Sequence, residues 1–137
     1  MATNQPAASK AKTSVANLEA VMKEVLVAAQ AGGARIETWR MCLHQGGEGC
    51  TCRKPKPGML LEILAELEKK YGEFDRAECW MLGDGITDLQ AGRAANVRVA
   101  LLAPKKLDVV TMLHEARVET DYWGEKLSDF AEFIAGR

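Results

Sequence analysis

Apolar residues recur along the chain at spacings that predict a series of helices. Between residues 14 and 30 they recur every three or four positions, as on one face of a helix, and Gly32-Gly33 follows as a stop signal. The same spacing predicts a second helix over 57–71, with Pro57 in its first turn, and a short alanine-rich helix over about 87–96.

Between these helices lie short stretches with the pattern of strands. Residues 35–41 alternate apolar and polar side chains and predict a strand ending at Cys42. Residues 79–82 and 97–102 are short apolar runs, typical of buried strands of a parallel sheet. The remaining tail predicts a helix over 109–116, a short strand near Val118 and an amphipathic helix from about Ser128.

This alternation of helices and strands predicts one α/β domain over residues 1–137. The expected fold is an open, Rossmann-type parallel sheet flanked by helices. In such folds the functional loops leave the carboxyl ends of the strands, which here lie after Met41 and after Leu82.

Charge and composition narrow the class of partner. The 137 residues include 18 basic and 19 acidic side chains, a net charge of −1, so no nucleic-acid or membrane surface is indicated. No apolar run has the length of a membrane span, and no secretory signal is recognised, so we expect a cytoplasmic protein. The first residues are rich in Ala, Ser and Thr, which leaves a transit peptide as an alternative, although no arginine occurs there.

Cysteines and a histidine cluster after the first predicted strand, in a loop over residues 42–52. Cys42 and His44 are followed after five residues by Cys50 and Cys52, while Cys79 stands alone in an apolar run, where we expect it to be buried. Three thiolates and one imidazole fill a tetrahedral zinc shell and leave no open position, which indicates a structural zinc. The alternative is that these thiols are incidental to a surface loop.

Three further stretches carry polar chemistry, each with a simpler alternative. Arg53, Lys54 and Lys56, held extended by prolines before a helix, suit a phosphate, although the segment could be a solvated basic loop. Asp84 and Asp88 follow a buried strand and suit Mg²⁺, although they could serve as a turn former and a helix N-terminal charge. Residues 3–5, "TNQ", would by themselves be an unstructured terminus.

Taken together and in this order, the four stretches resemble the haloacid dehalogenase (HAD) superfamily of phosphatases. Within it they are similar to the branch of heptose-bisphosphate and histidinol-phosphate phosphatases. The resemblance runs from Thr3 to about Leu102 and is most specific over 50–59, "CTCRKPKPGM". It implies Mg²⁺-dependent hydrolysis of a small phosphorylated metabolite, such as a sugar phosphate or histidinol phosphate.

The resemblance also implies a role for each matching residue. Thr3 would hydrogen-bond the transferring phosphoryl group, with Asn4 beside it at the substrate. Lys54 would balance the charge of nucleophile and phosphate, and Arg53 would contact the substrate phosphate. Asp84 would ligate Mg²⁺ with support from Asp88, and the cluster Cys42, His44, Cys50 and Cys52 would hold a structural zinc.

One family motif does not occur in the sequence. HAD phosphatases attack phosphorus with an aspartate of an Asp-x-Asp motif on a central strand that precedes "TNQ", and the 137 residues contain no Asp-x-Asp. We therefore expect a sheet incomplete at its N-terminal side, with a slot that calls for a complementing segment or self-association, and no activity of the chain alone. The alternative is a non-catalytic, zinc-stabilised phosphate-binding module.

Overall fold

The computed structural model describes residues 1–104 and 108–136. Its strands and helices alternate along the chain. In order they are β1 (Ala2–Asn4), α1 (Val15–Ala31), β2 (Arg40–Cys42), α2 (Gly58–Tyr71), a 3-10 turn (Arg76–Glu78), β3 (Trp80–Gly83), α3 (Ile86–Ala94), β4 (Arg98–Leu102), α4 (Val109–Ala116), β5 (Tyr122–Gly124) and α5 (Leu127–Ala135).

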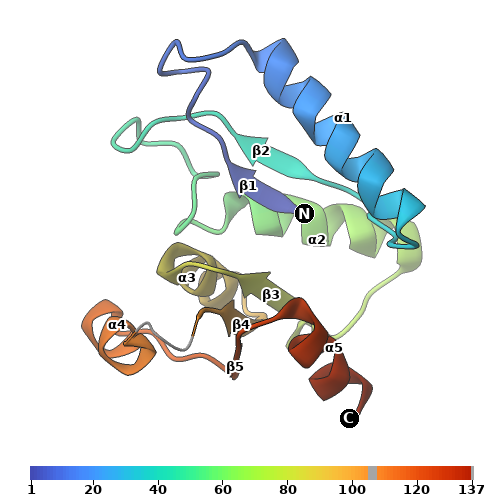
Figure 1. The fold of residues 1–137 in the computed structure, drawn as a ribbon, viewed down its shortest axis with the longest axis vertical. Coiled ribbons are helices and arrows are strands. Elements are labelled where there is room, and N and C mark those ends of the chain that lie inside the picture. The colour runs from blue at the N-terminus through green and yellow to red at the C-terminus, as the bar shows by residue number, and fades with distance from the viewer. Residues whose placement is uncertain (105–107, 137) are drawn as a thin grey trace.

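The strands form two parallel sheets (Figure 1). The first pairs β1 with β2, with Thr3 opposite Met41, and the second has the order β3-β4-β5, with Leu82 opposite Ala100. Parallel strands joined through helices confirm the predicted α/β class. The β1–β2 pair also gives residues 3–5 a place at a strand end, so the "TNQ" stretch is not an unstructured terminus.

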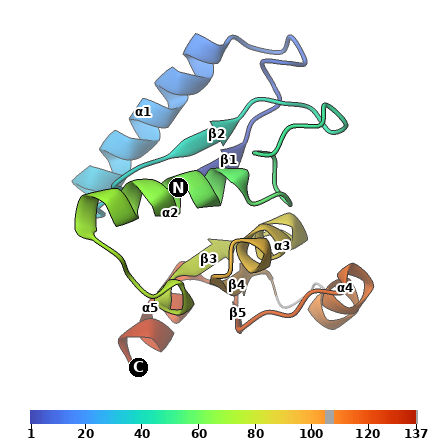
Figure 2. The same cartoon turned by 180° about the vertical axis from the view of Figure 1, so that it is seen from behind.

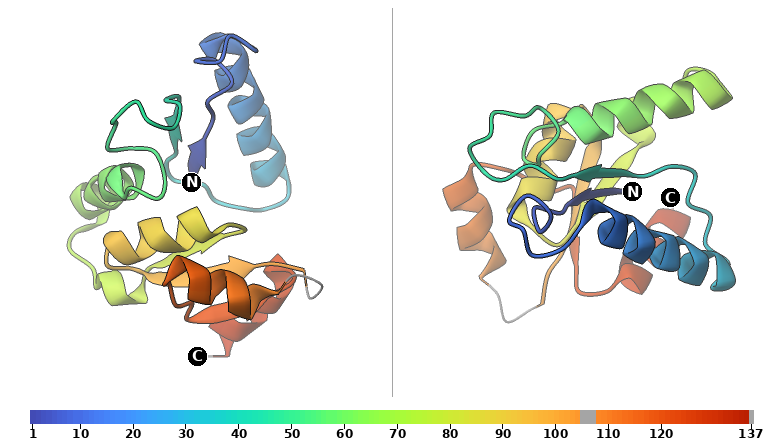
Figure 3. Two further views of the ribbon diagram at one scale, coloured as in Figure 1. Left: turned by 90° about the vertical axis from the view of Figure 1, so that its left-hand side faces the viewer. Right: turned by 90° about the horizontal axis from the view of Figure 1, so that it is seen from above.

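Helices cover both faces of each sheet. Figure 3 shows α1 and α2 on opposite sides of the β1–β2 pair. In the second sheet, the buried side chains Val99 and Leu101 pack with Leu89 of α3, while Trp80 packs its ring against Phe130 of α5 at a centroid distance of 5.3 Å. Because Trp80 and its neighbour Met81 point to opposite faces of β3, and Met81 packs with the α3 cluster, α3 and α5 lie on opposite faces.

The predicted helices end where their capping residues indicate. Ser14 caps α1 by accepting a hydrogen bond from the backbone N–H of Asn17, and Gly32 follows its last residue. Pro57 is the N-cap of α2, one position before the expected first turn, and Gly72 follows its end. Among the described residues, no helix is both long and apolar enough to cross a membrane.

Two predicted strands differ from the observed ones. The strand expected over 35–41 is reduced to Arg40–Cys42, because its partner β1 offers only Ala2–Asn4 for pairing. The strand expected near Val118 lies at Tyr122–Gly124 instead. Val118 is buried because it packs into the cluster around Leu89 and Val99, so its burial comes from side-chain packing rather than from strand pairing.

In the part of the chain that the structure describes, the two sheets do not join. β1 and β3 belong to different sheets. The apolar run 79–82 was expected to be buried, but every residue of β3 is only half-buried, whereas the three central residues of β4 are buried. Cys79 is likewise half-buried. The reason is that β4 has a strand on each side, and β3 has one on one side only.

Candidate functional site

The predicted zinc ligands converge in the loop between β2 and α2. Their four ligand atoms all lie within 4.8 Å of one another. The Cys42 Sγ atom is 3.1 Å from Cys52 Sγ and 3.9 Å from Cys50 Sγ, and His44 Nδ1 is 3.3 Å from Cys52 Sγ. Cys42, at the end of β2, is fully buried and anchors the cluster to the sheet.

This donor set fits a tetrahedral zinc ion. With a Zn–S bond of about 2.3 Å, the sulfurs of a tetrahedral shell are about 3.8 Å apart, close to the 3.9 Å between Cys42 and Cys50, while the 3.1 Å between Cys42 and Cys52 is shorter. The loop reverses through Gly47 and Gly49, whose φ angles of 93° and 72° lie in the left-handed region that glycine adopts without strain. All four cysteines are free thiols, so no disulfide competes for these sulfurs.

The electrostatics of the cluster also favour a cation. Burial, together with the neighbouring thiols of Cys42 and Cys50, raises the pKa of Cys52 to about 12. Burial also acts to raise the pKa of Cys50, but hydrogen bonds from the backbone of Arg53 and the side chain of Cys52 outweigh it and leave the pKa below its ordinary value. Three thiolates therefore need a divalent metal to coexist here near neutral pH.

Lys54 contacts both β1 and the aspartate-bearing segment after β3. Its ammonium lies 2.6 Å from Asp88 Oδ1 and donates to the Ala2 carbonyl at 2.9 Å, and both charged side chains are about nine-tenths buried, with 11% and 8% of their surfaces exposed. Asn4 holds the Lys54 backbone from both sides, accepting from its N–H and donating to its carbonyl, each at 3.1 Å. The carboxyl ends of β1 and β3 are thus linked through one lysine.

The two aspartates after β3 differ in their surroundings. Asp84 is exposed in the turn between β3 and α3, where its carboxylate is accessible to a cation. Asp88 is 5% exposed, and its second oxygen accepts from the backbone N–H of Gly85 at 3.1 Å. Because both Asp88 oxygens already have partners, the arrangement suits a supporting residue, and Asp84 alone of this pair offers a direct ligand to Mg²⁺.

The remaining predicted residues line the same end of the strands. Arg53 donates to the carbonyl of His44 at 2.9 Å and so ties the basic segment to the loop over 42–52. Lys56, the third cation of the predicted basic loop, donates to the Cys50 carbonyl at 2.6 Å. The Thr3 hydroxyl accepts from the Gln5 amide at 3.1 Å. A cavity of about 210 Å³ opens between the glycines of the loop and Arg53, Lys54 and Lys56.

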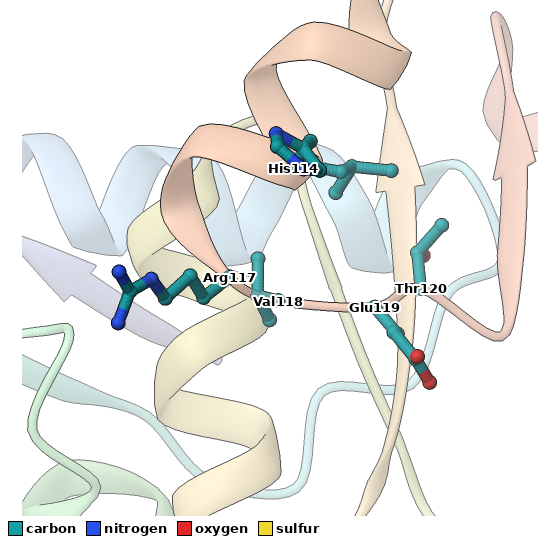
Figure 4. Close-up of a pocket in the computed structure, with 6 residues that line it drawn as sticks. His114, Arg117, Val118, Glu119 and Thr120 are labelled. Carbon is teal, nitrogen blue, oxygen red and sulfur yellow. The ribbon is translucent and has the colours of Figure 1, made fainter.

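A second cavity, of about 810 Å³, lies away from these residues (Figure 4). It is lined by Leu113, His114, Arg117, Val118, Glu119 and Thr120, where the chain leaves α4 for β5. In Figure 4 the side chains of Arg117 and Glu119 point in different directions and do not converge on a common ligand. We therefore place the candidate site at Lys54, where buried charges and aligned polar groups meet.

Several known proteins are similar to this chain over much of its length. A HAD-hydrolase-like family model matches residues 51–130. A heptose-1,7-bisphosphate 7-phosphatase of Pseudomonas aeruginosa is 38% identical over 108 residues, which cover 77% of this chain and 57% of that protein. The enzyme of the same name from Neisseria meningitidis serogroup A is 33% identical over 137 residues, covering 98% of this chain and 70% of its own length.

The fold agrees as well. The crystal structure of the D,D-heptose 1,7-bisphosphate phosphatase from Bordetella bronchiseptica, complexed with magnesium and phosphate, superposes with a TM-score of 0.79 at 29% identity. It aligns with 98% of this chain, which spans 72% of that structure. The parallel α/β fold, the family model and the relatives together show that the chain belongs to the HAD-hydrolase-like family.

Proposed function

We propose that this chain supplies most of a HAD-type phosphatase site, which hydrolyses the phosphomonoester of a small phosphorylated metabolite with Mg²⁺. The observation that carries the proposal is the convergence of Asn4, Lys54 and Asp88 at the ends of two parallel strands. The names of the relatives favour a sugar bisphosphate such as heptose bisphosphate as the substrate. Histidinol phosphate, the other substrate class of this branch, serves as the comparison substrate.

The charges of the site suit the binding of a phosphoryl group. Lys54 supplies a buried cation, and the Thr3 hydroxyl of β1 would donate to a phosphate oxygen. Arg53 and the cavity beside it provide room and charge for the remainder of a phosphorylated substrate. Asn4 acts through Lys54, because its amide is occupied with the Lys54 backbone, and is a positioning residue rather than a substrate contact.

Both metals have matching donors. Asp84 would ligate Mg²⁺, which supplies charge neutralisation at the phosphate when bound, and Asp88 would hold Lys54 beside it. The cluster of Cys42, His44, Cys50 and Cys52 would hold zinc in a closed shell. Because Arg53 and Lys56 both donate to carbonyls of the loop between these ligands, the zinc would fix the basic segment in place. Reduced thiols and a zinc site fit the cytoplasm.

The nucleophile has to come from outside these residues, since the 137 residues contain no Asp-x-Asp motif. We expect the purified 137-residue chain to show no hydrolysis of heptose bisphosphate, histidinol phosphate or p-nitrophenyl phosphate above background, with or without Mg²⁺. A phosphate-release assay measures this. Robust turnover by the chain alone that is lost in Asp84→Asn would contradict the assignment of the missing group.

A non-catalytic phosphate-binding module is the second candidate, favoured by the same set of cations without a nucleophile. The phosphatase and the binding module differ in how they respond to an added segment that carries the aspartate. The phosphatase gains turnover when a segment that carries the aspartate is supplied, whereas the module binds inorganic phosphate through Arg53 and Lys54 and gains none.

A further inference from the structure

The cysteine cluster between β2 and α2 has both closely spaced sulfurs and partly exposed ones. Cys42 is fully buried, whereas Cys50 and Cys52 are half-buried, and all three are free thiols. Figure 2 shows the loop that carries them reaching beyond the end of β2 before it returns to the start of α2. A small oxidant in the solvent can therefore reach Cys50 and Cys52 directly, while Cys42 is shielded from it.

The distances between the sulfurs favour one pair for a disulfide. Cys42 Sγ lies 3.1 Å from Cys52 Sγ and 3.9 Å from Cys50 Sγ. Because a disulfide bond is about 2.05 Å long, the first pair closes with a movement of about 1 Å, and the second needs about twice that movement. Cys50 and Cys52 are two positions apart in the chain, a spacing that strains a disulfide. The geometry therefore favours Cys42 with Cys52.

These two sulfurs are half of the proposed zinc shell. A thiolate is a metal ligand, but a sulfur in a disulfide has lost the charge and the electron pair that make it one. A bond between Cys42 and Cys52 would leave His44 and Cys50 as the remaining ligands of the cluster. Because a structural zinc site needs four ligands, the cluster could no longer retain the ion.

The two remaining ligands are also the residues to which the basic segment is bonded. Arg53 donates to the His44 carbonyl at 2.9 Å, and Lys56 donates to the Cys50 carbonyl at 2.6 Å. Both cations line the cavity of about 210 Å³ beside the loop. Once His44 and Cys50 are no longer fixed by a metal, both carbonyls can move, and the two cations lose their fixed positions at the cavity.

We propose that Cys42 and Cys52 form a reversible disulfide with hydrogen peroxide as the oxidant, which opens the zinc shell and releases the basic segment. The Cys52 thiolate attacks one peroxide oxygen, the O–O bond breaks, and hydroxide leaves a sulfenic acid on Cys52. The Cys42 thiolate then attacks Cys52 Sγ and expels a second hydroxide. Each sulfur is thus oxidised by one electron, and peroxide is reduced to two hydroxide ions.

Treatment of the zinc-loaded chain with hydrogen peroxide tests this reaction. We expect release of about one zinc per chain, measured with a chromogenic zinc indicator. Peptide mapping by mass spectrometry without reduction should find Cys42 joined to Cys52, and a thiol reductant with added Zn²⁺ should restore the thiols and the metal content. A disulfide that contains Cys50 instead, or cysteine sulfinic acids without a disulfide, would overturn the proposal.

Cys52→Asp and Cys50→Asp form a matched pair of variants. Each keeps a side chain that can ligate zinc, since carboxylates are zinc ligands, but Cys52→Asp alone removes a sulfur of the proposed disulfide. Peroxide should release zinc from Cys50→Asp, and at least tenfold more slowly from Cys52→Asp. Equal rates would contradict the proposed pair. If the variants do not load zinc, Cys50→Asp should still form the disulfide with Cys42, and failure to do so would contradict it equally.

Binding of inorganic phosphate measures the consequence for the site, and this part rests on the proposed function. The peroxide-treated chain should bind phosphate about tenfold more weakly than the reduced, zinc-loaded chain, because Arg53 and Lys56 are no longer held at the cavity. Reductant and Zn²⁺ should restore the affinity. Absence of phosphate binding by the reduced chain would contradict the proposed function, whereas unchanged binding after the disulfide has formed would contradict the release of the basic segment.

Discussion

Removal of metal from the cluster of Cys42, His44, Cys50 and Cys52 is expected to lower the unfolding temperature by on the order of 10 °C, roughly 3 kcal/mol. The loop over 42–57 joins β2 to α2 and has little apolar packing of its own, since Cys42 is its one buried residue among those described. Its shape therefore depends on the four ligands. The measurement is thermal unfolding before and after treatment with a chelator, with readdition of Zn²⁺ to restore the starting value.

Two cysteine variants distinguish zinc binding by the cluster from a general effect of losing a thiol. Protein purified without a chelator should contain about one zinc per chain, and Cys52→Ser should lose both the zinc and the response to the chelator. Cys79→Ser is the matched control, because Cys79 lies outside the cluster, and it should leave the zinc content unchanged. Metal-free protein with four freely titrating thiols would refute the zinc site.

Replacement of Lys54 is the second large effect. The Asp88 side chain is only 8% exposed, so Lys54→Met leaves a buried carboxylate without its cation. This variant is expected to lower the free energy of unfolding by about 3–5 kcal/mol. The Ala2 carbonyl loses its donor as well. Urea unfolding at pH 7 measures the change. The double variant Lys54→Met/Asp88→Asn removes both charges and should recover a substantial part of the loss, since no unpaired charge stays buried.

Lys56→Met provides the control from the same segment. Lys56 is exposed and makes a hydrogen bond to the Cys50 carbonyl, so its loss should cost less than about 1 kcal/mol. If Lys54→Met and Lys56→Met were equally stable, the buried pair with Asp88 would not be the link between the two sheets.

Local patterns in the sequence were sufficient to predict the helices and the cluster of candidate metal ligands. The helices α1 and α2 begin and end beside Ser14, Gly32 and Gly72, whose conformational preferences act over a few residues. The cluster at 42–52 is also local, because its four ligands lie within eleven residues of chain and one loop brings them together. Such features depend on neighbours in sequence, and their spacing is visible without the fold.

Long-range pairing could not be predicted in the same way. The strand expected over 35–41 is short because of β1, far away in the sequence, and Val118 is buried by packing rather than by a strand. The pairing of Asn4 with the Lys54 backbone spans 50 residues, and no local pattern distinguishes it from a substrate contact. The half-burial of β3 also follows from pairing, because among the described strands β3 has a neighbour on one side only.

We propose that these residues form a phosphatase site that lacks its Asp-x-Asp segment. The most direct measurement is phosphate release from heptose bisphosphate by the chain mixed with an excess of a peptide whose alternating valines and leucines end in Asp-x-Asp. We predict Mg²⁺-dependent turnover that is absent when asparagine replaces the first of these aspartates and is lost in Asp84→Asn. No turnover from a chain that binds the peptide, or equal turnover with the asparagine peptide, would contradict this assignment.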